Sequence, residues 1–193
     1  MALYVSLEAV QAFTDPDQGI PMIRGLIRGA ADNLGGVVGE AAKVYDDSAL
    51  PREEMVASTV RSLLKCLSVA VGKPLYVFFD EADCLSGATV ITFLQQLRDC
   101  AVSLEKGKNF PASIALIGMR NIRDYKAQIR PDSETLGSAS PFNVVTEALT
   151  LRTFSEQELR ALYAQHTVAT GQVFTEEALG CLLYTSPGPR DTR

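Results

Sequence analysis

Two adjacent carboxylates, Asp80 and Glu81, directly follow the apolar run Leu75–Phe79. The run is too short for a helix and too continuously apolar for a half-exposed strand, so it predicts a parallel strand covered on both faces. Ligands of open α/β sheets bind at the carboxyl ends of the strands, where these acids would lie. In nucleotide hydrolysis one such acid holds Mg²⁺, usually through water, and the other polarises the attacking water. We expect these roles for Asp80 and Glu81, respectively. The alternative is that they form only an N-cap and the acidic first turn of a following helix.

The phosphate-binding half of a nucleotide site is missing from the sequence. A phosphate-binding loop has the pattern G-x-x-x-x-G-K-[S/T], whose backbone N–H groups and lysine surround the phosphates. Gly72-Lys73 and Gly107-Lys108 have no glycine five residues earlier, and Pro74 and Asn109 follow them in place of Ser or Thr. The acidic half of the site is therefore present without the other half.

The elements expected around the acids alternate between strands and helices. Apolar runs predict strands at 3–7, 75–79, 113–117 and 144–151. Helical spacing and caps predict helices from about Pro21 to Gly35, from 51 to 70, from 87 to 104, from Ser155 to Gly171 and from Thr175 onward. Residues 34–50 are weakly patterned, and 131–142 are expected to form a loop. Strands alternating with helices imply a parallel sheet flanked by helices, and the consecutive helices after the last strand imply a separate helical appendage.

Composition limits the classes of protein. The 193 residues are 47% hydrophobic and 21% charged, which is typical of a globular chain, and no apolar stretch approaches the roughly 20 residues of a membrane span. The start of the chain resembles neither a signal peptide nor a transit peptide, so we expect a cytoplasmic protein. A net charge of −5 argues against a surface devoted to nucleic acid. The one basic cluster is interpreted as a solvated helix face, with a phosphate or nucleic-acid contact as the alternative; it comprises Arg120, Arg123, Lys126 and Arg130.

The cysteines carry little chemical signal. The four cysteines form no CxxC pair, and with the single His166 they show no metal-site spacing, so reduced thiols are expected. An enzyme that uses Cys84 or His166 would need a second catalytic group, and the sequence shows none.

Segments 75–85, 114–121 and 142–171 together resemble an AAA+ or STAND-type P-loop ATPase, over roughly residues 2–180. The resemblance makes residues 75–81 a Walker B element and implies ATP and Mg²⁺ as cofactors. It assigns Asp80 to Mg²⁺, Glu81 to water activation, and the sensor-1 position to Asn121 or Arg120, although Asn121 could instead cap the following helix. Residues 80–83 also spell the DEAD-box signature, but those helicases carry a Ser-Ala-Thr element after the next strand, where this chain has Gly118-Met119-Arg120.

The resemblance also divides the chain. Residues 1–151 are expected to be a P-loop NTPase core that lacks its first strand, and residues 152–180 the start of a helical lid. No sensor-2 arginine is found, and the missing P-loop implies that Met1 lies inside the gene. In the family's strand order, 5-1-4-3-2, loss of the first strand would orphan strand 144–151. Residues 181–193 are expected to be a non-native or disordered tail, because Cys181–Pro187 resembles a translated sequencing adapter; a flexible natural C-terminus is the alternative.

The expected function of the parent protein is ATP binding and hydrolysis that drive a conformational switch. The chain by itself is expected to be inactive and to bind ATP weakly or not at all. The alternative is a non-catalytic interaction or scaffold module of the same fold. The partners left open are a protein or DNA target and a homo-oligomer of the parent, and no membrane is expected.

Overall fold

The computed structural model describes residues 1–105, 109–119 and 149–185, and the chain forms two compact units, Met1–Thr146 and Glu147–Arg193. The first unit is an α/β unit. Its strands are β1 (Ala2–Ser6), β2 (Tyr76–Asp80) and β3 (Ser113–Leu116). Its helices are α1 (Pro16–Leu34), α2 (Gly36–Val44), α3 (Arg52–Val71) and α4 (Gly87–Glu105), with short 3₁₀ turns η1 (Glu8–Val10) and η2 (Ala82–Cys84). These bounds confirm the predicted strands at 3–7, 75–79 and 113–117 and the helices predicted at 51–70 and 87–104.

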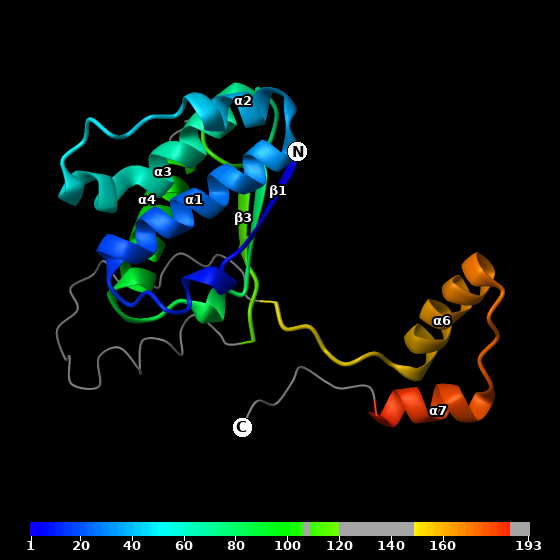
Figure 1. Cartoon of the computed structure of the whole chain (residues 1–193). Coiled ribbons are helices and arrows are strands. Elements are labelled where there is room, and N and C mark those ends of the chain that lie inside the picture. Colours follow the sequence, from blue (N-terminus) through cyan, green and yellow to red (C-terminus); the bar gives the residue numbers. More distant parts are fainter. Residues whose placement is uncertain (106–108, 120–148, 186–193) are drawn as a thin grey trace. The chain divides into compact units, whose positions relative to one another are not determined.

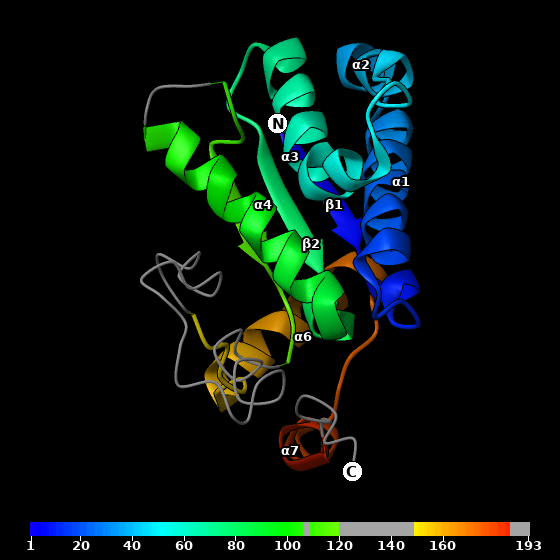
Figure 2. The same cartoon turned by 90° about the vertical axis from the view of Figure 1, so that its left-hand side faces the viewer.

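The three strands form a parallel sheet in the order β1-β2-β3, so the strand that carries the acids lies in the centre (Figures 1 and 2). Leu3 pairs with Val77, and Val77 pairs with Ile114. Side chains in register point to the same side of a sheet, so one face is apolar along its whole width. Because the strands are parallel, all three carboxyl ends meet at one edge.

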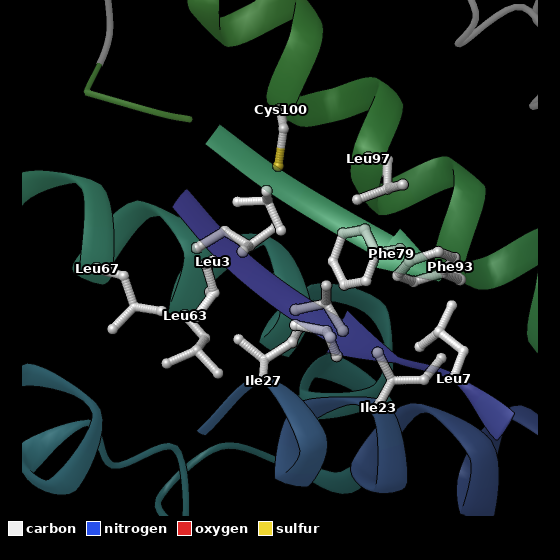
Figure 3. Packing of buried hydrophobic residues seen from close by; sticks show 14 of the residues in the cluster. Leu3, Leu7, Ile23, Ile27, Leu63, Leu67, Phe79, Phe93, Leu97 and Cys100 are labelled. Atoms are coloured by element: carbon white, nitrogen blue, oxygen red, sulfur yellow. The ribbon is translucent and has the colours of Figure 1, made fainter. Parts of the chain in front are cut away.

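Helices α1, α3 and α4 pack on this apolar face and form the core with it. Figure 3 shows the buried side chains that meet there, among them Leu3, Phe79, Ile23, Leu63 and Phe93. The rings of Phe79 and Phe93 pack edge to face with their centroids 5.1 Å apart. Burial of one such side chain stabilises the fold by about 1.5–3 kcal/mol, so this core fixes β2 firmly against α4.

The opposite face of the sheet is uncovered within the described residues, so the prediction that β2 is covered on both faces is wrong there. Tyr4, Tyr76 and Phe78 are 58%, 44% and 36% exposed on that face. The crossovers from β1 to β2 and from β2 to β3 step across the sheet in the same direction, and two crossovers of the usual right hand then place their helices on the same side. The apolar run in the sequence could not reveal this, because aromatic residues occupy the exposed positions.

The region before α3 differs from the sequence expectation. Helix α1 begins five residues earlier than expected, because Asp15 caps it and Pro16 occupies its first turn, so Pro21 lies inside the helix. Residues 36–44 form a helix that the weak pattern did not predict, and this helix packs Val38 and two alanines into the core. The loop behind α2 is held by Asp47, whose buried carboxylate pairs with Arg24 and accepts a hydrogen bond from Thr59.

The second unit contains two consecutive helices, α6 (Glu156–Thr170) and α7 (Glu176–Thr185). The predicted capping box is confirmed, because Ser155 and Glu158 exchange side-chain and backbone hydrogen bonds, and α6 ends at Gly171 in the left-handed conformation. Residues 149–151 are not a strand, and 144–148 lie outside the described residues. Helix α7 includes 181–185, the first residues of the expected tail, and the rest of that segment is not described.

Candidate functional site

Asp80 is the last residue of β2, and Glu81 follows it at the carboxyl edge of the sheet. Backbone hydrogen bonds join this point to both neighbouring strands. The N–H of Leu7 donates to the carbonyl of Asp80 at 2.9 Å, and the N–H of Ala82 donates to the carbonyl of Ile117 at 2.8 Å. The ends of β1, β2 and β3 are therefore held in register around the two acids.

Glu81 has an unusual backbone conformation. Its φ of 56° and ψ of 37° are left-handed, and it is the only residue other than glycine with positive φ among the described residues. Non-glycine residues held in this region cost roughly 1–3 kcal/mol and cluster at functional sites. Glu81 occupies the N-cap position of η2, and Asp83 lies in its first turn, but the exposed side chain of Glu81 makes no capping hydrogen bond and no other hydrogen bond or ion pair within the described residues. The capping interpretation therefore does not explain Glu81.

The Asp80 carboxylate is held from two sides. Oδ1 accepts the backbone N–H of Glu81 at 2.9 Å, and Oδ2 accepts the hydroxyl of Tyr4. The pKa of Tyr4 is raised, chiefly by this hydrogen bond and then by burial and by the negative charges of Asp80 and Glu81. Each carboxylate oxygen can accept more than one hydrogen bond, so acceptor capacity remains on both.

Tyr4 is not among the site residues predicted from the sequence. It lies on the neighbouring strand opposite Phe78, two residues before Asp80 and on the same uncovered face. The alternation of apolar and polar residues in β1 would have placed Tyr4 on one face of its strand. Its meeting with Asp80 depends on the pairing register, which no local pattern contains.

Asp83 occupies the space beneath the end of β3. Its Oδ1 is buried and has no hydrogen-bond partner within the described residues. A Cβ added to Gly118 would lie 2.6 Å from that oxygen, so only glycine fits here without a shift. The end of β3 thus contacts the turn that follows the acids. Arg120 and Asn121, the expected sensor-1 residues, lie outside the described residues, as does the rest of the basic cluster.

The carboxylate oxygens at this edge of the sheet fit a hydrated Mg²⁺, but the residues present do not form a complete nucleotide site. Within residues 1–105, 109–119 and 149–185, no three His, Cys, Asp or Glu side chains are placed to hold a metal ion. Mg²⁺ usually keeps several waters and binds through one or two carboxylates, a role that Asp80 suits. No phosphate-binding loop occurs in residues 1–193, so nothing in the sequence provides the cradle that ATP needs.

The cysteine chemistry that the sequence left open finds no support at Cys84. Burial raises the pKa of this thiol, and the charges of Asp83, Glu81 and Glu8 raise it further. The thiolate is the nucleophilic form, so this environment disfavours it.

Comparison with protein-family models, with curated proteins and with solved structures gave no match to this chain. Among the helices that the structure describes, none combines the length and the apolar character required to cross a membrane.

Proposed function

We propose that this chain carries the metal- and water-binding half of an ATP-hydrolysing core of the AAA+ or STAND type, whose nucleotide state drives a conformational switch. The observation that carries the proposal is the position of Asp80 and Glu81 at the carboxyl end of the central strand of a parallel sheet. The strand order supports the proposal. In the resembled family the third strand lies between the second and the fourth, and here β2 lies between β1 and β3.

In this proposal the two acids have different tasks. The Asp80 carboxylate would accept hydrogen bonds from the water shell of Mg²⁺, because its hydrogen bonds with the Tyr4 hydroxyl and the Glu81 N–H leave acceptor capacity on both oxygens. The exposed Glu81 carboxylate accepts a hydrogen bond from the attacking water and polarises it. Bound Mg²⁺ would supply charge neutralisation at the phosphates. Asn121 or Arg120, which lie outside the described residues, remains the proposed contact to the nucleotide.

The proposal requires a phosphate-binding loop outside residues 1–193. The chain by itself should therefore bind ATP weakly or not at all. Isothermal titration of residues 1–193 with Mg-ATP tests this expectation, and a micromolar Kd would contradict it.

The catalytic assignment is tested by Glu81→Gln in the full-length protein. This variant should keep ATP binding and lose hydrolysis by roughly 10²–10⁴-fold, because the amide cannot accept the proton of the water. Glu54→Gln, an exposed glutamate in the first turn of α3, is the matched control and should hydrolyse ATP normally. Turnover retained in Glu81→Gln would refute the assignment.

One observation favours the second candidate, a non-catalytic interaction module. The uncovered sheet face exposes Tyr4, Tyr76 and Phe78, and exposed aromatic side chains are enriched at protein interfaces. A full-length protein without the glycine-lysine loop would support this module in place of the hydrolase.

A further inference from the structure

We propose that Tyr4 is a positioning residue for Asp80: its hydroxyl orients the carboxylate so that the remaining acceptor positions stay available to a hydrated Mg²⁺. The inference rests on the metal role proposed for Asp80. It adds a residue from a second strand to a site that the sequence confined to β2 and the end of β3.

The pairing register explains why this position needs a tyrosine. Tyr4 is opposite Phe78, so Asp80 is its diagonal neighbour on the next strand and on the same face. A diagonal neighbour is farther away than the residue directly opposite, so a long aromatic side chain can reach it where a serine or threonine hydroxyl would not. Phenylalanine would fill the same space without a donor.

Two hydrogen bonds restrict the carboxylate where one would not. The Cβ–Cγ torsion of an aspartate is broad, so a single bond leaves the group free to turn. The Glu81 N–H holds Oδ1 and the Tyr4 hydroxyl holds Oδ2, from different strands of the site. Together they fix the plane of the carboxylate.

Packing does not account for Tyr4. Its side chain is on the uncovered face and is 58% exposed, whereas its neighbours Leu3 and Val5 are buried. The hydroxyl contact with Asp80 is the one hydrogen bond that the Tyr4 side chain makes within the described part of the chain. A hydrogen-bonding role therefore explains this residue better than a core role.

The expected effect follows from the behaviour of hydrogen-bond partners of metal ligands. Loss of such a partner typically lowers metal affinity by about 10–100-fold. Because Asp80 would act through water and Tyr4 is exposed, we expect a loss that is at or below the lower end of this range, roughly 3–10-fold.

The test uses the 193-residue chain, isotope-labelled for NMR, and a titration with Mn²⁺ as a paramagnetic substitute for Mg²⁺. The wild-type chain should show broadening of the amide signals of residues 80–82 that excess Mg²⁺ relieves. Tyr4→Phe should shift the Mn²⁺ midpoint to roughly 3–10-fold higher concentration. Tyr76→Phe is the matched control: Tyr76 is exposed on the same face, its hydroxyl makes no hydrogen bond within the described residues, and its loss should leave the midpoint unchanged.

Asp80→Asn separates this inference from the proposed function. If Asp80→Asn removes the broadening but Tyr4→Phe leaves the midpoint unchanged, the role of Tyr4 is overturned and the metal role of Asp80 stands. If the wild-type broadening does not depend on Asp80, both are overturned. A purely structural role would lower the melting temperature of Tyr4→Phe without moving the Mn²⁺ midpoint, and that result also overturns the proposal.

Discussion

Replacing Gln96 with leucine should lower the free energy of unfolding of the α/β unit by about 2 kcal/mol. Gln96 lies on α4 and is only 1% exposed, and its side-chain amide hydrogen-bonds to the backbone of α3. Nε2 donates to the carbonyl of Val56 at 2.9 Å, and Oε1 accepts the N–H of Val60 at 2.9 Å and of Arg61 at 3.2 Å. The amide thus joins α3 and α4, two of the helices that cover the apolar face of the sheet.

The magnitude follows from these three bonds and from what replaces them. Each buried hydrogen bond contributes about 0.5–1.5 kcal/mol net, so three contribute roughly 1.5–4.5 kcal/mol. The loss is moderated because Val60 N–H and Val56 C=O are an i→i−4 pair of α3, so the helix itself can satisfy both groups without Gln96. The leucine side chain also fills most of the volume of the Gln96 side chain with apolar atoms. The balance is therefore near the low end, about 2 kcal/mol, equivalent to a fall in Tm of about 4–8 °C in a unit of this size.

The assay is urea unfolding followed through the methyl NMR signals of the buried core, which report on the α/β unit alone. Gln95→Leu is the matched control, because Gln95 is the preceding residue on the same helix and is exposed. It should change the unfolding free energy by less than about 0.5 kcal/mol. Hydrogen exchange at Val60 and Arg61 should become faster in the Gln96 variant only. Equal stabilities of the two variants would refute the argument.

Three further measurements test the packing and the titrating groups. Gly19→Ala should destabilise the unit by about 1–3 kcal/mol, because the added Cβ would lie 2.4 Å from a methyl carbon of α4. Gly25→Ala should stabilise it by about 0.5–1 kcal/mol, because an added Cβ there would meet nothing within 4 Å. Shifts in Tm of the same sign for the two variants would contradict this pair of predictions. The pKa of Glu158 is lowered to about 2, first by the hydrogen bond from Arg152 and then by the capping-box bonds. Since this pKa lies below the ordinary value of about 4.3, the stability that Glu158 contributes is present above pH 4.3 and is lost as the pH falls toward 2. A midpoint near pH 4 in a ¹³C NMR titration of the Glu158 carboxyl group would contradict the lowered pKa. Burial raises the pKa of the Cys100 thiol to about 12, so Cys100 should resist iodoacetamide at pH 8 until urea unfolds the chain, and labelling of the native protein, located by mass spectrometry, would contradict this.

The features confirmed from sequence depend on contacts between residues close in the chain. Ser155 caps α6 because its partner Glu158 is three residues away, and α3 begins after Pro51 with two acids in its first turn. The short apolar run before Asp80 indicated the strand and the position of the acids at its end. Caps and periodicity act within one helical turn or one strand, so a single sequence contains them.

The features that no local pattern predicted depend on residues far apart in the chain. Helix α2 is stabilised by packing into a core that spans the whole unit, which outweighs the weak propensity of its glycines. The exposure of Tyr76 and Phe78 follows from both crossovers lying on one side of the sheet. The left-handed backbone of Glu81 accompanies a turn that is hydrogen-bonded to the end of β3.

The sequence by itself determined that a parallel α/β unit carries Asp80 and Glu81 at the end of a strand and that consecutive helices follow it. Only the tertiary structure decided which face of the sheet is covered, that Gln96 joins two helices, and that Tyr4 reaches Asp80 across 76 residues of chain. The physical reason is that side-chain alternation determines which residues share a face, whereas the pairing register and the direction of the crossovers determine what each face meets. Those two choices result from the packing of the whole chain, and no local pattern in the sequence records them.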